Sequence, residues 1–246
     1  MVNHGQERRI VFLITAAGKG SRFPKSEWDT EKPLIQIDGR LMIEYAIRSL
    51  PIRPSDILVL ALKSGNIFKQ VKALLPVLNL PCEIKLVEIP KDTNGQAETA
   101  YLALKEIDTE EVLIIHNCDT AFNLPRTVSL WRPINSLLLF KGVEPRWSYA
   151  EMNSEGFITR TEEKKVISEL ASTGTYQFSS VKLFQECYQR GHATKTEFYI
   201  APMYNQVLKK GLQVYGIVVD QVFLLGTPED LLNNANKLRN DWIPFC

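Results

Sequence analysis

The chain has 246 residues, a length sufficient to bury a sizeable core without disulfide or metal staples. Hydrophobic residues make up 45% and charged residues 23% of the chain, which excludes a disordered or low-complexity protein. The 29 Lys and Arg residues nearly balance the 28 Asp and Glu residues, and no long run of like charge is present. We therefore expect no nucleic-acid partner.

Four cysteines form no Cys-x-x-Cys pair and only three histidines are present, so neither a zinc site nor a disulfide framework is indicated. This use of cysteine favours a reducing cytoplasm. The apolar stretch 10–17 after Arg8 and Arg9 imitates a secretory signal, but it runs directly into glycine-rich residues and is better explained as a strand. No stretch approaches the roughly eighteen apolar residues of a membrane span, so we expect no membrane partner.

Apolar, β-branched runs recur along the first part of the chain and predict strands buried on both faces. They lie at residues 10–14, 57–60, 84–87, 112–115 and 136–140. Stretches with helical spacing lie between them, at residues 42–50, 67–75 and 96–107. Strands that alternate with helices predict an α/β fold with a mainly parallel sheet and right-handed crossovers.

After about residue 142 the pattern changes to shorter strands and further helices. We predict strands at residues 148–152, 156–162, 174–178 and 214–219, and helices at 181–190 and 200–210. Thr227 then caps a last helix that has Pro228 in its first turn. Because no linker rich in Pro, Gly or Ser separates the two parts, we predict one domain, residues 1–246, with halves at about 1–141 and about 142–246.

The most informative segment is the loop Thr15-Ala16-Ala17-Gly18-Lys19-Gly20-Ser21-Arg22, which directly follows the first predicted strand. Small residues let backbone N–H groups approach an anion, and ligands of α/β sheets collect at the carboxyl ends of strands. The loop fits neither common nucleotide motif, because a Walker loop needs glycine at Leu13 and Gly-x-Gly-x-x-Gly fails at Phe23. A plain glycine-rich turn is the alternative.

Two cations favour an anion site over a plain turn. Arg22 ends the loop, and Lys32 follows ten residues later, ahead of an Asp38-Gly39 turn. Arginine holds phosphate oxygens in a fork and lysine adds a compact charge, so the two together suit a polyphosphate. The alternative is a pair of solvated surface cations.

Further motifs follow along the chain. The loop motif Ala-Ala-Gly-x-Gly-Ser-Arg is followed by Glu-Lys-Pro-Leu and then by Ile-x-Gly-x-x-Met-Ile-Glu-Tyr. Five more segments follow in order: Gly95-Gln96-Ala97-Glu98-Thr99, Asn117-Cys118-Asp119, Glu163-Lys164, Gly174-Thr175-Tyr176-Gln177-Phe178 and Leu225-Gly226-Thr227-Pro228-Glu229-Asp230-Leu231. In this order they resemble the sugar-phosphate nucleotidyltransferase family, in particular its small members of the capsule or surface-polysaccharide type. The resemblance implies a Rossmann-like fold of three αβα layers around a mainly parallel mixed sheet, related to that of GT-A glycosyltransferases.

The resemblance also implies site residues, with the first half binding a nucleotide and the second half an acceptor. Nucleotide-binding residues are then Ala16, Ala17, Gly18, Lys19, Gly20 and Ser21 in the loop, with Gly95 and Gln96 in a turn that is similar to the family's base-contacting turn. Catalytic cations are Arg22, Lys32 and Lys164, and acceptor-binding residues are Lys164, Gly174, Tyr176 and Glu197. A solvated charged turn is the alternative for residues 162–165.

A magnesium ion is the cofactor that the resemblance implies. Asp119 follows the apolar run 112–115, which places its carboxylate at a strand end beside the glycine loop. Mg²⁺ takes one or two carboxylates together with phosphate oxygens and water. Larger members of the family carry a second Asp where this chain has Leu224, so we predict Asp220, at the end of the strand 214–219, as its substitute. A turn or cap is the alternative role for either acid.

The implied reaction joins a nucleoside triphosphate to a phosphorylated small molecule, such as a sugar 1-phosphate, and releases pyrophosphate, for surface or capsular polysaccharide precursors. No general base is needed, because a phosphate monoester has a second pKa of about 6, and His116 is expected to be a packed or surface residue.

Two alternatives stay open. A GT-A-type glycosyltransferase would use a sugar nucleotide, but Asn117 stands where such enzymes need the first Asp of Asp-x-Asp. A catalytically silent nucleotide-binding protein is kept open by Leu224. The sequence does not decide the base, the acceptor, or whether the chain forms a homo-oligomer.

Overall fold

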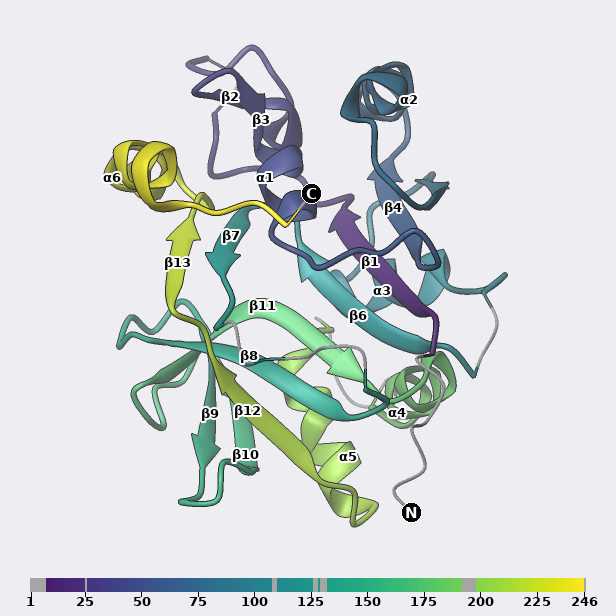
Figure 1. Cartoon of the computed structure of the whole chain (residues 1–246), viewed down its shortest axis with the longest axis vertical. Coiled ribbons are helices and arrows are strands. Elements are labelled where there is room, and N and C mark those ends of the chain that lie inside the picture. The colour runs from purple at the N-terminus through teal and green to yellow at the C-terminus, as the bar shows by residue number, and fades with distance from the viewer. Residues whose placement is uncertain are drawn as a thin grey trace.

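The computed structural model describes residues 8–24, 26–107, 110–125, 128, 132–191 and 198–245. A nine-stranded sheet crosses the molecule (Figure 1). Its strands are β1 (Ile10–Ala16), β4 (Ile57–Lys63), β5 (Glu83–Ile89), β6 (Val112–Asn117), β8 (Asn135–Lys141), β9 (Ser148–Met152), β10 (Ile158–Glu163), β11 (Leu170–Phe178) and β12 (Val214–Val218). Their order is β10-β9-β11-β6-β1-β4-β5, with β8 also beside β11 and β12 beside β8.

The strands of the first half are parallel at the centre of the sheet. β1 pairs in parallel with β4 and β6, and β4 pairs in parallel with β5. Successive residues of β1 face opposite sides, so that Val11 and Leu13 join one core cluster and Phe12 joins the other. Burial on both faces explains the continuous apolar runs in the sequence.

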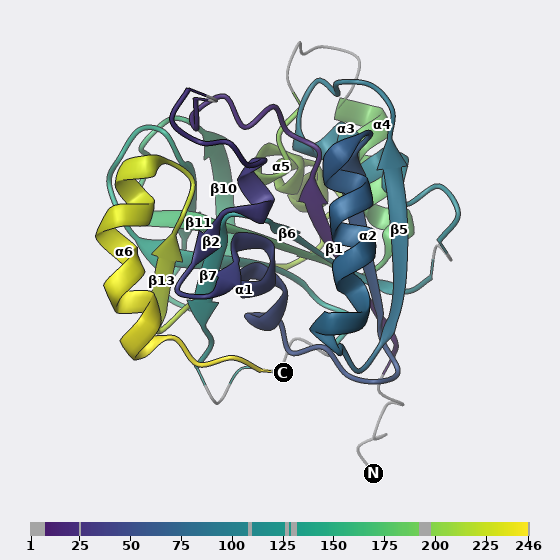
Figure 2. The ribbon, with the colours of Figure 1, turned by 90° about the horizontal axis from the view of Figure 1, so that it is seen from above.

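Helices cover both faces of the sheet. They are α1 (Met42–Arg48), α2 (Asn66–Leu78), α3 (Gln96–Ala103), α4 (Val181–Gly191) and α5 (Tyr204–Lys209). Ala100, Phe184 and Tyr204 bring α3, α4 and α5 into one core cluster, and Ile47 and Val71 bring α1 and α2 into the other. Figure 2 shows the two groups on opposite sides. The predicted three-layer αβα fold with a mixed sheet is therefore confirmed.

β11 joins the two halves in one sheet. It runs antiparallel to β6, β8 and β9, and its register against β8 shifts between Ser172 and Tyr176. Gly174 lies within this irregularity with φ +80°, and a Cβ at Gly174 would lie 2.0 Å from Nδ2 of Asn117. Only glycine fits here, because the strand bulges around the Asn117 side chain.

Two short ribbons and a helix form an outlying cluster that the sequence analysis resolved only in part. β2 (Gln36–Ile37) and β3 (Arg40–Leu41) flank the predicted Asp38-Gly39 turn, whose two residues both have positive φ. β7 (Thr120–Asn123) pairs with β13 (Gln221–Leu224), and neither strand was predicted from the sequence.

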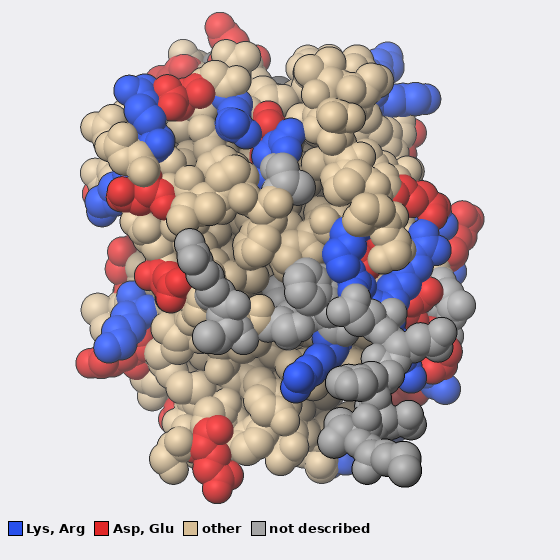
Figure 3. All heavy atoms as spheres, in the orientation of Figure 1, with Lys and Arg blue, Asp and Glu red and all other residues tan. Residues whose placement is uncertain are grey.

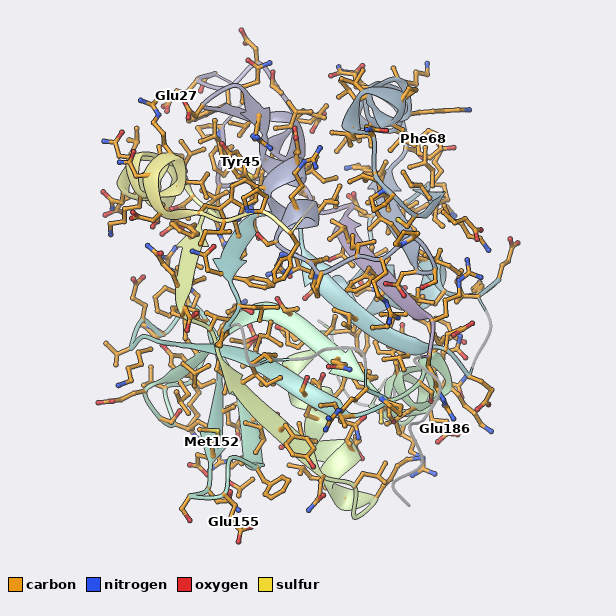
Figure 4. All side chains as sticks on the ribbon, in the orientation of Figure 1. Glu27, Tyr45, Phe68, Met152, Glu155 and Glu186 are labelled. Atoms are coloured by element: carbon orange, nitrogen blue, oxygen red, sulfur yellow. The ribbon has the colours of Figure 1, made fainter. Side chains whose placement is uncertain are left out.

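The last helix, α6 (Pro228–Asp241), begins at the predicted cap, where Thr227 Oγ1 accepts from the backbone N–H of Asp230 at 3.1 Å. Tyr45, labelled in Figure 4, packs its ring against Trp242 just beyond α6, with centroids 4.7 Å apart. Trp242 Nε1 also donates to Ser49 Oγ at 3.0 Å. These contacts fix the end of α6 to α1.

The other predicted elements are present with shifted ends. The helix predicted at 96–107 ends at Ala103, and the one predicted at 200–210 begins as a 3₁₀ turn, Ala201–Met203, because Pro202 cannot donate in a helix interior.

On the face shown in Figure 3, acidic and basic side chains are interspersed. Within the described ranges, no helix has the length and apolar character needed to cross a bilayer.

Candidate active site

A cavity of about 780 Å³ opens at the carboxyl ends of β1 and β6, and residues from both halves of the chain line it. Its size suits a small-molecule site. Most of the predicted site residues line it: Ala16, Ala17, Gly18, Lys19, Gly20, Arg22, Lys32, Gly95, Gln96, Asp119, Gly174 and Tyr176. Ser21, Lys164 and Asp220 are not among the lining residues, and Glu197 lies outside the described residues.

The glycine-rich loop leaves β1 after Ala16 and passes directly against Lys32. Gly20 has φ +62°, and a Cβ on it would lie 3.4 Å from the Cβ of Lys32. Among the described residues, no backbone carbonyl accepts from the amides of residues 18–22. Successive amides that are not used within the fold form a concave site for an anion.

Lys32 and Asp119 form an ion pair in this cavity, with side chains 15% and 19% exposed. Lys32 Nζ donates to Asp119 Oδ2 at 2.5 Å and to the carbonyl of Gly226 at 3.2 Å. Burial alone would lower the pKa of Lys32 and raise the pKa of Asp119. The attraction between them outweighs burial, so the pKa of Lys32 is raised and the pKa of Asp119 is lowered. Both groups are therefore charged at neutral pH.

A second ion pair lines the same cavity, and the sequence analysis did not single it out. Both terminal nitrogens of Arg146 donate to the Asp230 carboxylate at 2.7 Å, and Nε donates to Glu144 at 2.6 Å. Burial would raise the pKa of Asp230, but the hydrogen bonds from Arg146 hold it below its usual value. The partners are 84 residues apart, so no local motif could have revealed the pair.

Asp119 and Asp230 approach each other across Gly226. A Cβ on Gly226 would lie 3.3 Å from Asp119 Oδ2 and 3.7 Å from Asp230 Oδ2. Within the described part of the chain, no three His, Cys, Asp or Glu side chains gather as an all-protein metal site. Mg²⁺ needs only one or two carboxylates when phosphate oxygens and water complete its shell, so these residues fit a cation that binds together with a polyphosphate.

Asp220 lies apart from this arrangement. β13 runs from Gln221, opposite Asn123, to Leu224, opposite Thr120. Asp220 is therefore at the far end of the ribbon from Asp119, roughly 13 Å along the strand. Its side chain is exposed, and Leu224 lines the cavity instead. The strand-end argument misplaced Asp220, because the chain passes from β12 directly into β13 without facing the cavity.

The Glu-Lys pair is split between the cavity and the surface. Glu163 lines the cavity and accepts a hydrogen bond from Ser148 Oγ. Lys164 is exposed with φ +54°, and its Nζ bonds the Tyr199 hydroxyl and lies 4.6 Å from the centre of that ring. Tyr199 itself lines the cavity. Lys164 thus lies behind a lining residue.

The turn at Gly95 connects the two halves of the cavity. Gly95 has φ +133°, and a Cβ there would lie 2.5 Å from the carbonyl oxygen of Phe198. On either side, Ala97 N–H donates to Phe198 O at 3.0 Å and Phe198 N–H donates to Asn94 O at 2.7 Å. This close backbone approach requires glycine.

Two buried polar residues hold the back of the cavity. His116 is fully buried, donates from Nε2 to Thr120 O at 2.9 Å and accepts at Nδ1 from Thr175 Oγ1 at 2.8 Å. Burial lowers the pKa of His116 to about 4, so it is a neutral packed residue, as expected from the sequence. Burial also raises the pKa of Tyr176, which lines the cavity, to about 12.

Comparisons with known proteins agree with this geometry. The sequence model of the MobA-like NTP transferase domain matches residues 12–133. The structure resembles a nucleoside-diphosphate-sugar pyrophosphorylase from Vibrio cholerae, with a TM-score of 0.77 and 25% identity over 92% of this chain and 99% of that one.

Two further solved structures share the fold at lower identity. An inositol-1-phosphate CTP transferase from T. maritima has a TM-score of 0.75 and 17% identity, over 97% of this chain and 99% of that one. A UDP-glucose pyrophosphorylase solved with UDP-glucose has a TM-score of 0.73 and 16% identity, over 94% of this chain and 98% of that one. No curated protein matched the sequence. Residues 12–133 thus match the MobA-like NTP transferase domain, and the chain as a whole has the fold of the nucleotidyltransferases.

Proposed function

We propose that this nucleotidyltransferase joins a nucleoside triphosphate to a phosphorylated small molecule, such as a sugar 1-phosphate, and releases pyrophosphate. One observation supports the proposal above all: the glycine loop, Arg22 and the Lys32–Asp119 pair line one cavity. The same cavity holds a further cation, Arg146, which is paired with Asp230. The named activities of the structural neighbours, sugar pyrophosphorylases and a CTP transferase, support the same reaction class.

The triphosphate is held by the nucleotide wall of the cavity, which is formed by residues 16–20, Arg22, Lys32, Gly95, Gln96 and Asp119. The amides of residues 18–22 and the guanidinium of Arg22 bind the pyrophosphate that leaves, and Lys32 turns from Asp119 to the phosphate next to the nucleoside. An oxygen of the acceptor phosphate attacks that α-phosphorus while the bond to pyrophosphate breaks on the opposite side. The attacking oxygen is already anionic near neutral pH, so the residues supply positioning and charge neutralisation rather than a base.

Asp119, with Asp230 across Gly226, would hold a divalent cation. When bound, this cation neutralises charge on the triphosphate. The two carboxylates differ in their present partners, because Asp119 accepts from a flexible lysine and Asp230 from a two-pronged arginine.

The acceptor wall is formed by the second half of the chain. Arg146 is its cation within the cavity and is assigned to the acceptor phosphate, and Glu163 and Tyr176 line the same cavity. Lys164 contributes at the edge, behind Tyr199, and Glu197 keeps its predicted acceptor role. On the family resemblance, we assign the product to the supply of surface or capsular polysaccharide precursors. The reaction draws on nucleoside triphosphates, so we place it in the cytoplasm.

The test is a pyrophosphate-release assay with the purified chain. Four nucleoside triphosphates are combined with a panel of phosphorylated acceptors and Mg²⁺, and we expect turnover with one base and one class of acceptor. Arg22→Ala and Asp119→Asn lower the rate about a hundredfold or more, because each removes charge stabilisation at the reacting phosphates. Asp241→Asn, on the surface of α6, is the matched control and keeps the native rate.

Three outcomes would contradict the proposal. Turnover of a sugar nucleotide without pyrophosphate release would identify a glycosyltransferase, and nucleotide binding without turnover would identify a silent binding protein. Full activity in Arg22→Ala and Asp119→Asn, with native circular dichroism, would remove the site. Asp220→Asn and Asp230→Asn, compared by magnesium dependence, decide which acid is the second carboxylate, and the geometry favours Asp230.

A further inference from the structure

Three polar side chains meet on the floor of the cavity and are linked by hydrogen bonds. Gln96 Nε2 donates to Thr15 Oγ1 at 3.0 Å and to Asn117 Oδ1 at 2.5 Å. Thr15 and Asn117 are direct neighbours in the parallel pairing of β1 with β6, and all three residues line the cavity. Below, this group is called the polar trio.

Each member of the polar trio adjoins a region already assigned to one end of a nucleotide. Thr15 lies immediately before the phosphate-binding loop, and Asn117 lies two residues before Asp119. Gln96 follows Gly95, the turn that resembles the family's base contact. Because the sugar of a nucleotide connects its base to its phosphates, a nucleotide bound to both regions lays its sugar over the polar trio.

The polar trio has hydrogen-bonding capacity that the fold does not use. Gln96 Oε1, an acceptor, and Asn117 Nδ2, a donor, have no hydrogen-bond partner among the described residues. Neither atom is sealed from solvent, so both are accessible from the cavity. A sugar hydroxyl both donates and accepts, and it therefore complements an acceptor and a donor placed side by side.

The position of Asn117 is fixed by the backbone around it. Its side-chain amide fills the space left by the missing side chain of Gly174, and a Cβ on Gly174 would lie 2.4 Å from Asn117 Cγ. Gln96 then holds the amide from the other side through the 2.5 Å hydrogen bond. A side chain held on two sides is preorganised for recognition, which strengthens discrimination between ligands.

Resting on the proposed function, we propose that the polar trio recognises the ribose hydroxyls and makes the protein selective for ribonucleotides over deoxyribonucleotides. A site built to bind a hydroxyl disfavours a ligand that lacks it, because its own polar groups are then buried without a partner. Selectivity of about a hundredfold or more in kcat/KM is the expected scale.

The experiment compares each nucleoside triphosphate with its 2′-deoxy and 3′-deoxy counterparts in the pyrophosphate-release assay. The native protein prefers the ribonucleotide about a hundredfold, and the two deoxy probes show which hydroxyl is recognised. Asn117→Leu and Thr15→Val reduce the preference to less than about tenfold, because each lowers the rate with the ribonucleotide and leaves the deoxynucleotide rate nearly unchanged. Gln189→Met, on the surface of α4, is the control and keeps the native preference.

Calorimetry with the nucleotides alone separates this inference from the proposed function. Tighter binding of the ribonucleotide without any turnover would refute the proposed reaction and support the trio's role. Equal use of ribo- and deoxyribonucleotides by an active native protein would overturn the inference. Variants that lower both rates equally would also overturn it, since that pattern is what a merely structural trio produces. Thr15→Val keeps the test decisive if Asn117→Leu fails to fold.

Discussion

The two walls of the cavity are built in different ways. On the nucleotide wall, Arg22 and Asp119 follow closely after two strands of the parallel sheet, β1 and β6. On the acceptor wall, Arg146 after β8 meets Asp230 on α6, across 84 residues of chain. Both walls join residues that are distant in the sequence, since Lys32 and Asp119 are 87 residues apart. They differ in the elements used: Arg22 and Asp119 follow neighbouring parallel strands, whereas Asp230 lies on a helix outside the main sheet.

The walls also differ in what their charged groups contact. Lys19 on the nucleotide wall has a side chain 70% exposed and only a loose ion pair, at 3.4 Å, with Asp92. Arg146 on the acceptor wall is held by two carboxylates at 2.6–2.7 Å. A ligand anion therefore finds Lys19 open, whereas at Arg146, as at Lys32, it must replace a carboxylate already bound.

The largest expected effect comes from a substitution at Gly95, where the turn packs directly against the backbone of Phe198. In Gly95→Ala, the new methyl group would meet the Phe198 carbonyl at 2.5 Å in a backbone conformation that disfavours alanine. We expect a loss of about 3 kcal/mol or more in the free energy of unfolding. Urea denaturation measures it. Gly18→Ala is the matched control for stability, because nothing lies within 4 Å of its Cβ position; equal losses in both variants would contradict the prediction.

The second effect concerns His116, which links β6 of the parallel half to Thr175 of the antiparallel half. Burial lowers the pKa of His116 to about 4 in the folded protein, whereas an exposed histidine in the unfolded chain has a pKa of about 6.5. The unfolded chain therefore binds a proton first, and stability present above pH 6.5 is lost as the pH falls toward 4. The loss amounts to about 3 kcal/mol.

The measurement is the free energy of unfolding from urea titrations between pH 7 and pH 4, for the native chain and for His116→Gln. Other groups contribute to both curves, so the difference between the curves isolates His116. The native chain is expected to lose about 3 kcal/mol more than the variant over this range. Parallel curves would show that His116 does not carry this pH dependence.

The smallest effect sharpens the assignment of the acceptor wall. Arg146→Lys keeps the charge but loses the fork that spans two oxygens. We expect KM for the phosphorylated acceptor to rise about tenfold while KM for the nucleotide stays within about twofold. Arg160→Lys is the control, because Arg160 also binds a carboxylate, Glu162 at 2.6 Å, but outside the cavity. An equal rise in KM for the acceptor and in KM for the nucleotide would contradict the assignment of Arg146 to the acceptor wall.

These differences explain what the sequence could reveal. The layers, the parallel strands and the placing of Lys32 and Asp119 in one cavity with the glycine loop followed from apolar runs, strand ends and recognised motifs. Arg146 and Asp230 were missed as a pair because only tertiary packing brings them together. Asp220 was misplaced because the β7–β13 ribbon was not predicted, and this ribbon brings Leu224, and not Asp220, to the cavity.

Asp230 belongs to α6, outside the main sheet, and not to a strand end. Trp242, one residue past that helix, anchors it to Ser49 and Tyr45. The position of the Asp230 carboxylate opposite Asp119 therefore depends on the packing of Trp242. Removing the Trp242 ring would therefore loosen the helix that carries Asp230 and disturb the cavity from a distance.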